Sequence, residues 1–168
     1  RFANALLVLV PRHPERFGGV VRLIRKAGCR LARRSEQGGM LEPHTEVVLG
    51  DTMGELQLLY MASDVAFVGG SLVRGPGGHN LLEPAAAGIP VVFGPHMFNF
   101  EEVSRLTLEH GAGVQVRDAA ELGAAVAAYL EQAERRVGAG EAARRMVEEN
   151  RGALDKTLAL VRQALDRR

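Results

Sequence analysis

The stretch DVAFVGGSLVRGPGGHNLLEPAAAGIPVVFG (64–94) decides the fold. Its two ends, DVAFVGG and PVVFG, are short apolar runs rich in β-branched or aromatic residues, which is typical of strands buried on both faces. Between them a glycine-rich segment, GGSLVRGPGGHNLLEP (69–84), opens a short helix. Strand, helix and strand in this order predict a right-handed βαβ unit in a parallel sheet.

The same alternation of short apolar runs and helical spacing continues through the rest of the chain. It predicts further strands at 5–10, 29–35, 46–50 and 113–118, and helices at 16–28, 53–63 and 100–111. In the helix at 53–63 the spacing places Leu56, Leu59 and Tyr60 on one face. The fold class expected is therefore α/β, an open doubly wound parallel sheet of the Rossmann-like kind.

The tail from residue 119 onward is predicted to form two or three helices, broken around VGAG (137–140) and NRG (150–152). Apolar positions at helical spacing near the end, Leu158, Val161 and Leu165, suit core packing or docking on another domain equally well.

Length, composition and charge narrow the class of protein. The 168 residues are enough for one domain, and the 46% apolar and 24% charged content is that of a soluble globular protein. A net charge of +1 gives no reason to expect a nucleic-acid partner. No apolar run approaches the roughly 18 residues that span a bilayer, and no signal peptide is recognisable. Because the chain opens on Arg1, we expect a piece of a longer protein.

The lone Cys29 cannot form an internal disulfide bond, which fits a reducing compartment.

Polar and glycine-rich clusters follow four of the predicted strands. They are PRHPERF (11–17), GDTMGE (50–55), GGSLVRGPGGHNLLEP (69–84) and GPHMFNFEE (94–102). Because ligands of open α/β sheets bind outside the carboxyl ends of the strands, all four clusters are expected at the binding edge.

Helix capping explains part of this pattern without any ligand. Thr52-x-x-Glu55, Asn80-x-x-Glu83 and Asn99-x-x-Glu102 each have the spacing of a capping box, in which the two side chains satisfy free helix N–H groups. Capping does not explain the glycine pairs at 69–70 and 77–78. Glycine admits positive φ and a close ligand, and a glycine-rich loop before a helix favours phosphate.

Arg12 is the other indication of an anion site. It sits between two prolines directly after a predicted strand, so its backbone is held extended and its guanidinium suits phosphate or carboxylate, although a surface ion pair is the alternative. We interpret His13 as a structural hydrogen-bonding residue, and His79 adds little. No His, Cys, Asp and Glu cluster has the spacing of metal ligands, so we expect no bound metal.

Several motifs in order resemble one known family. The segments LVPRHPERF, VVLGDTMGELQLLYMASDVAFVGGSLV, GGHNLLEPAAAGIPVVFGPHMFNFEEV and GAGVQV are similar to the carboxyl-terminal half of the 3-deoxy-D-manno-octulosonic acid (Kdo) transferases. The likeness runs from about residue 5 to residue 118 and continues more loosely through the tail. At Arg74–Pro76 the chain is slightly longer than the family pattern, and no role is transferred to those residues.

The resemblance implies one half of a two-domain GT-B glycosyltransferase that moves Kdo from CMP-Kdo to a lipid A precursor with inversion. No cofactor is implied beyond this donor substrate. The family's contacts with CMP fall on nine positions of this chain, namely Pro11, Arg12, Met53, Gly54, Glu55, Asn80, Leu81, Leu82 and Glu83. Arg12, with the helix starts after Thr52 and Asn80, would stabilise the leaving phosphate.

The resemblance also implies what this chain lacks. The acceptor site, a membrane anchor and the catalytic base belong to the family's amino-terminal half, so residues 1–168 are expected to be a soluble donor-binding domain that does not turn over alone. The full-length protein is expected at the cytoplasmic face of the bacterial inner membrane. Three alternatives remain open from the residues: a domain for a UDP-sugar in another GT-B enzyme, a non-catalytic binding module, and a scaffold whose tail docks on a missing domain.

Overall fold

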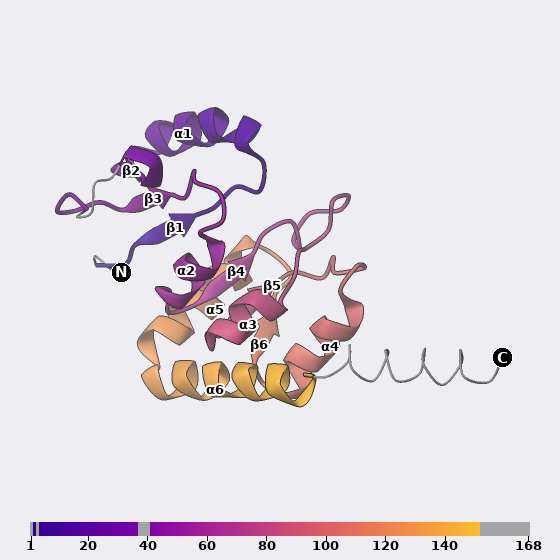
Figure 1. Cartoon of the computed structure of the whole chain (residues 1–168). Coiled ribbons are helices and arrows are strands. Elements are labelled where there is room, and N and C mark those ends of the chain that lie inside the picture. The colour runs from indigo at the N-terminus through magenta and orange to yellow at the C-terminus, as the bar shows by residue number, and fades with distance from the viewer. Residues whose placement is uncertain (1, 3, 37–40, 152–168) are drawn as a thin grey trace. The chain divides into compact units, whose positions relative to one another are not determined.

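The computed structural model describes residues 2, 4–36 and 41–151, and these divide into two compact units (Figure 1). The first unit ends at Leu59 and the second begins at Tyr60. The boundary falls inside the short helix α2 (Leu56–Met61). The tail positions Leu158, Val161 and Leu165 lie outside the described residues.

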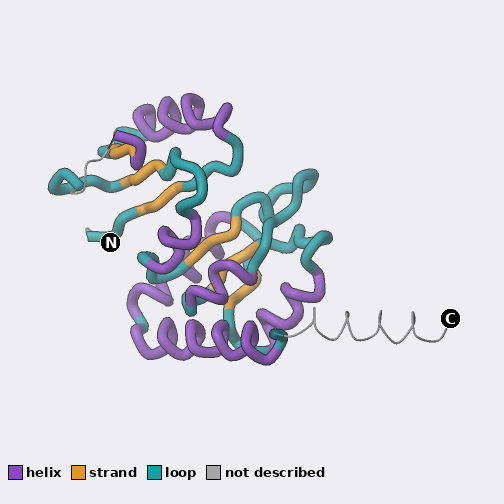
Figure 2. Tube along the Cα trace, viewed as in Figure 1, coloured by secondary structure: helices purple, strands orange, loops and turns teal. Residues whose placement is uncertain are grey.

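The first unit contains a three-stranded parallel sheet in the order β1-β3-β2 (Figure 2). Leu9 and Arg33 both lie opposite Leu49, so the three strands end level and their following loops leave the same edge. β3 is fully buried, whereas β1 is an edge strand and leaves Leu7 55% exposed. The elements are β1 (Leu7–Leu9), a 3-10 turn (Pro14–Arg16), α1 (Phe17–Lys26), β2 (Leu31–Arg33), a second 3-10 turn (Arg34–Glu36) and β3 (Val47–Leu49).

The second unit is built on another three-stranded parallel sheet, in the order β4-β5-β6. Its central strand β5 is completely buried because side chains on both faces are covered. Val91 and Phe93 pack with α3 and α6 on one face, and Val92 packs with Tyr129 of α5 on the other. The elements are β4 (Ala66–Val68), α3 (Leu82–Ala87), β5 (Val91–Phe93), α4 (Glu101–Glu109), β6 (Gly113–Gln115), α5 (Ala119–Glu131) and α6 (Ala133–Glu149).

These elements confirm the predicted α/β class, with parallel strands and covering helices. Each predicted strand is present as a three-residue core of the run expected from sequence. The predicted face of α2 is also confirmed, because Leu56, Leu59 and Tyr60 are half-buried while Leu58 and Met61 are exposed.

The predicted break at VGAG (137–140) is wrong. α6 runs without interruption from Ala133 to Glu149, and the break falls earlier, at Gln132 between α5 and α6. Glycine inside a helix costs about 1 kcal/mol relative to alanine, but Gly140 has a packing role. A Cβ atom there would overlap the carbonyl oxygen of Gly88, so the missing side chain lets α6 lie directly on the end of α3. The tertiary contact therefore overrides the local preference.

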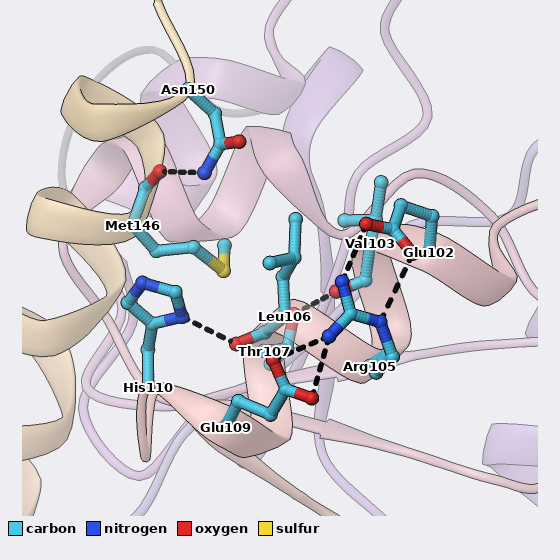
Figure 3. Close-up of polar contacts among 9 residues, drawn as sticks. All are labelled: Glu102, Val103, Arg105, Leu106, Thr107, Glu109, His110, Met146 and Asn150. Carbon is cyan, nitrogen blue, oxygen red and sulfur yellow. Dashed lines mark hydrogen bonds and ion pairs between the residues drawn. The ribbon is translucent and has the colours of Figure 1, made fainter.

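A polar link joins the end of α4 to the end of α6. His110 donates from Nδ1 to the carbonyl oxygen of Leu106 at 2.9 Å (Figure 3). Its Nε2 lies 3.1 Å from a carboxylate oxygen of Glu149. A neutral imidazole can donate from only one nitrogen, so the protonated form satisfies both acceptors at once. These two partners raise the pKa of His110, the Leu106 carbonyl more than Glu149.

This link makes stability pH-dependent with a definite sign. Since the folded-state pKa of His110 lies above its ordinary value of 6.5, the stabilisation is fully present below that pH and is lost as pH rises through the raised pKa. We expect His110→Gln to lower the free energy of unfolding more at about pH 5.5 than at about pH 8.5. Urea unfolding at both pH values measures this, and Glu149→Gln should reproduce part of the effect. A loss independent of pH would contradict the assignment.

Candidate functional site

In the first unit, the loops after β1 and β3 leave the carboxyl edge of the sheet together. The backbone N–H of Gly50 donates to the carbonyl oxygen of Leu9 at 2.9 Å, which ties the start of one loop to the end of the neighbouring strand. Arg12 and Gly54 are exposed, and Met53 is 75% exposed. An apolar side chain this exposed has no core role and is available to a ligand.

Glu55 is a preorganised acceptor in this first group of loops. Its carboxylate accepts hydrogen bonds from the Thr52 hydroxyl and from Arg34 Nη2, the latter at 2.7 Å. The hydroxyl of Thr52 and then Arg34 lower the pKa of Glu55, so the carboxylate is ionised at neutral pH. The expected Thr52–Glu55 pair exists, but it joins the two side chains to each other. The Glu55 carboxylate has further lone pairs, so it can also accept hydrogen bonds from hydroxyl groups of a ligand.

A buried carboxylate beneath these loops was missed by sequence reasoning. The side chain of Asp51 is 1% exposed and accepts from Arg33 Nε at 2.8 Å, Ser35 N–H at 2.9 Å and the Ser35 hydroxyl at 2.7 Å. Burial alone would raise the pKa of Asp51, but the hydrogen bonds from Ser35 and Arg33 lower it. Asp51 thus anchors the end of β2 to the end of β3 and directs Arg34 toward Glu55. The signal was present as two consecutive arginines at the end of the strand predicted at 29–35 and an aspartate in the cluster GDTMGE (50–55).

In the second unit, the glycine-rich loop after β4 is fastened to the loop after β5. The buried hydroxyl of Ser71 donates to the Val68 carbonyl at 2.6 Å and accepts from the Gly94 N–H at 2.7 Å. The carbonyl of Ser71 accepts from the His96 N–H at 2.9 Å, and the carbonyl of His96 accepts from the Gly78 N–H at 2.7 Å. We call these four hydrogen bonds the Ser71 clamp.

Three glycines of this loop are explained by packing within the chain. A Cβ atom at Gly70 would overlap the Gly77 carbonyl oxygen, one at Gly77 would overlap the Phe98 ring, and one at Gly78 would overlap the Met97 sulfur. The sequence hypothesis of close ligand approach is therefore not needed for these positions. They let the loop reach the Ser71 clamp.

The segment Asn80–Glu83 emerges from the clamped loop at the start of α3. Asn80 Oδ1 accepts from the Leu82 N–H at 2.9 Å, and Asn80 Nδ2 donates to Glu83 Oε1 at 3.3 Å. Leu81 is fully buried in the core, so only its main chain can meet a ligand, while Leu82 and Glu83 are exposed. Asn80 therefore accepts one free N–H at the start of α3, but the predicted capping box is not formed, because Glu83 bonds the Asn80 side chain and no side chain caps the N-cap residue Leu81. Both side chains keep further polar groups available to a ligand.

The structure also describes the segments at Asn99 and at Arg74–Pro76. The proposed capping box at Asn99 is wrong, because no side chain caps α4 and Glu102 instead bonds Arg105. Arg74–Pro76 form an exposed turn.

Within residues 2, 4–36 and 41–151, no group of three or more His, Cys, Asp and Glu side chains is arranged to hold a metal ion. No helix in that part of the chain is long and apolar enough to cross a bilayer.

The nine positions predicted to contact a nucleotide therefore fall in both units. The first unit carries five of them, and the structure brings Pro11 and Arg12 to the same sheet edge as Met53, Gly54 and Glu55. The second unit carries the consecutive residues Asn80–Glu83.

Polar and glycine-rich loops at the carboxyl ends of parallel strands are typical of ligand-binding α/β proteins, and the sheet of each unit carries such loops. The profile of the family described as glycosyl transferases group 1 matches residues 32–146, which is more than half of the chain. The chain therefore belongs to the group 1 glycosyl transferases. Within that class it belongs to the 3-deoxy-D-manno-octulosonic acid transferase family.

The relatives that support the second statement are similar over most of the chain. The 3-deoxy-D-manno-octulosonic acid transferase of Haemophilus influenzae is 46% identical over 168 residues, which are 99% of this chain and 39% of that protein. That of Bordetella pertussis is 43% identical over 91% of this chain and 36% of its own length. The chain thus spans well under half of either relative.

One solved structure is similar in both sequence and shape. It is described as the crystal structure of the C-terminal CMP-Kdo binding domain of WaaA from Acinetobacter baumannii. It is 37% identical, with a TM-score of 0.80, and the match covers 84% of this chain and 73% of that one.

The packing of the glycine-rich loop yields a matched pair of substitutions. Gly70 and Gly111 both have positive φ, 82° and 67°, but only Gly70 has backbone against the position of a Cβ atom. We expect Gly111→Ala to cost about 1–2 kcal/mol of stability from the left-handed backbone alone. Gly70→Ala should cost about 1–3 kcal/mol more because of the overlap with Gly77. Urea unfolding followed by circular dichroism measures both, and equal losses would show that the loop is not clamped as described.

Proposed function

We propose that this chain is the donor-binding half of an inverting glycosyltransferase that transfers Kdo from CMP-Kdo to a lipid A precursor. The observation that carries the proposal is the 37% identity and TM-score of 0.80 to a domain described as binding CMP-Kdo. The near-complete coverage of the chain by relatives with Kdo transferase activity in their names supports it further.

The nucleotide contacts are proposed by residue. In the first unit, Arg12 meets the phosphate, Glu55 accepts from ribose hydroxyls, and Met53 and Gly54 meet the base, with Pro11 fixing the direction of Arg12. Support comes from the exposure of Arg12 and Met53 and from the ionised state of Glu55. In the second unit, Glu83 and Asn80 offer side chains, Leu82 its exposed side chain, and Leu81 only its main chain.

The reaction assigns a specific task to Arg12. An acceptor hydroxyl, deprotonated by a carboxylate in the amino-terminal half of the enzyme, attacks the anomeric carbon as the bond to the CMP phosphate oxygen breaks. Negative charge builds on the departing phosphate in the transition state, so a fixed guanidinium there binds the transition state more strongly than the ground state. α2 and α3 have only six residues each, so any contribution from their helix starts comes from a few free N–H groups.

The cellular setting follows from the acceptor. A lipid A precursor is a membrane lipid, so we place the whole enzyme at the cytoplasmic face of the bacterial inner membrane. The acceptor and the membrane would be contacted through the amino-terminal half.

Nucleotide preference tests the proposal on this chain alone. We expect calorimetric titration to give binding of CMP and much weaker binding of UMP and UDP, as the similarity to a CMP-Kdo binding domain implies. Tighter binding of UDP would favour a UDP-sugar enzyme. Absence of any nucleotide preference would favour a non-catalytic binding module, and either result would overturn the proposal.

Arg12→Ala tests the catalytic assignment in the full-length enzyme. Loss of one preorganised donor to the developing charge typically lowers kcat by about 10²–10³-fold, and we expect a loss of that order with an unchanged melting temperature. Arg25→Ala, an exposed arginine on α1, is the matched control and should leave turnover unchanged. Near-normal turnover of the Arg12 variant would remove Arg12 from the site.

A further inference from the structure

The fourth polar cluster at the strand ends, GPHMFNFEE (94–102), has no role in the proposed nucleotide site. In the second unit this segment borders a surface hollow of about 420 Å³. The hollow is lined by the loop after β5, one face of α4 and the end of β6, with Pro95, His96, Phe98, Glu101, Leu108 and Gln115 among its residues. Its volume lies at the lower end of the range for small-molecule sites.

Hydrogen bonds and side-chain packing connect the lining of the hollow to the segment proposed to bind the nucleotide. His96 lines the hollow and accepts the Gly78 N–H at 2.7 Å, two residues before Asn80. Phe98 also lines the hollow, and its ring packs on Gly77. The Ser71 clamp therefore holds the lining of the hollow and the start of Asn80–Glu83 in one rigid arrangement.

The chemistry of the lining suits a neutral, hydroxyl-bearing ligand. Phe98 and Leu108 are 53% and 43% exposed, which offers apolar surface to the C–H faces of a sugar. The carboxylate of Glu101 has no partner among the described residues and can accept from hydroxyl groups.

Arg105 also borders the hollow but does not make it an anion site. Its guanidinium is 2.6 Å from a carboxylate oxygen of Glu102 and 2.6 Å from one of Glu109 (Figure 3). Two carboxylates more than neutralise this one cation. With Glu101 nearby, the hollow disfavours a carboxylate or phosphate and favours the hydroxylated part of a ligand.

We propose that this hollow binds the hydroxylated part of the donor sugar while the attached nucleotide lies on Asn80–Glu83. The inference rests on the proposed function and extends it from the nucleotide to the sugar. Glu101 accepts hydrogen bonds from sugar hydroxyls, and Phe98 and Leu108 contact the apolar face of the sugar. The sugar carboxylate points away from the hollow, because the guanidinium of Arg105 is already paired with Glu102 and Glu109 and Glu101 would repel a carboxylate.

Two ligands that share the nucleotide separate the sugar contact from the nucleotide contact. The chain and its Glu101→Gln variant are each titrated with CMP and with CMP-Kdo by calorimetry. We expect the substitution to weaken CMP-Kdo binding by about tenfold, as for loss of one hydrogen bond to a charged acceptor, and to leave CMP binding unchanged. Glu141→Gln on α6, which also removes an exposed carboxylate, should leave both affinities unchanged.

Amide chemical shifts locate the sugar independently of affinity. Shifts that differ between the CMP-Kdo and CMP complexes should include those of His96, Phe98 and Glu101. Differences confined to residues outside the hollow, an unchanged CMP-Kdo affinity in Glu101→Gln, or an equal loss for both ligands would each overturn the inference and leave the proposed function intact. A native chain that binds neither ligand would overturn the proposed function itself, and the sugar site with it.

Discussion

The loops of the second unit depend on one buried hydroxyl. A parallel sheet leaves long connections at its carboxyl edge, and their backbone groups need partners if they are not to face water. The loop between β4 and α3 finds these partners through Ser71, whose hydroxyl bridges Val68 and Gly94 and whose carbonyl receives the His96 N–H. Because Ser71 is fully buried, all three bonds form away from competing water. The start of α3 is thereby held by hydrogen bonds within the chain.

In the first unit, a buried carboxylate rather than a hydroxyl holds the loops at the carboxyl ends of the strands. Asp51 is almost inaccessible, and an ion there is tolerated only when hydrogen bonds replace its hydration. Arg33 and Ser35 supply those bonds, and as a result the ends of β2 and β3 are fixed relative to each other. The next residue, Arg34, then reaches Glu55. In both units a buried polar residue holds the backbone while exposed neighbours remain available to a ligand.

The sequence was sufficient for the elements, since strands flanked by glycine or proline and helices with clear periodicity are local signals. It did not show that the strands form two three-stranded sheets in two units, so that the loops after β1 and β3 meet at one edge and those after β4 and β5 at another. It was insufficient wherever a distant contact decided the outcome. The helix through Gly138 and Gly140 could not be predicted because its support is Gly88, about fifty residues earlier in the chain. Likewise, the glycines at 70, 77 and 78 indicate an unusual backbone, but only the structure shows that Phe98 lies against Gly77 and Met97 against Gly78.

This distinction affects how residue roles are transferred within the family. A motif such as GGHNLLEP combines residues that shape the loop with residues that can meet a ligand, and both kinds are required for the motif to be recognisable. Leu81 belongs to the first kind by burial and to the second only through its main chain, whereas Asn80 and Glu83 can serve both. The N–H of Leu82 is already taken by Asn80, so a phosphate or sugar cannot use that donor unless Asn80 moves. The ligand contacts proposed for this segment are therefore restricted to side chains and to the N–H groups that Asn80 leaves unoccupied.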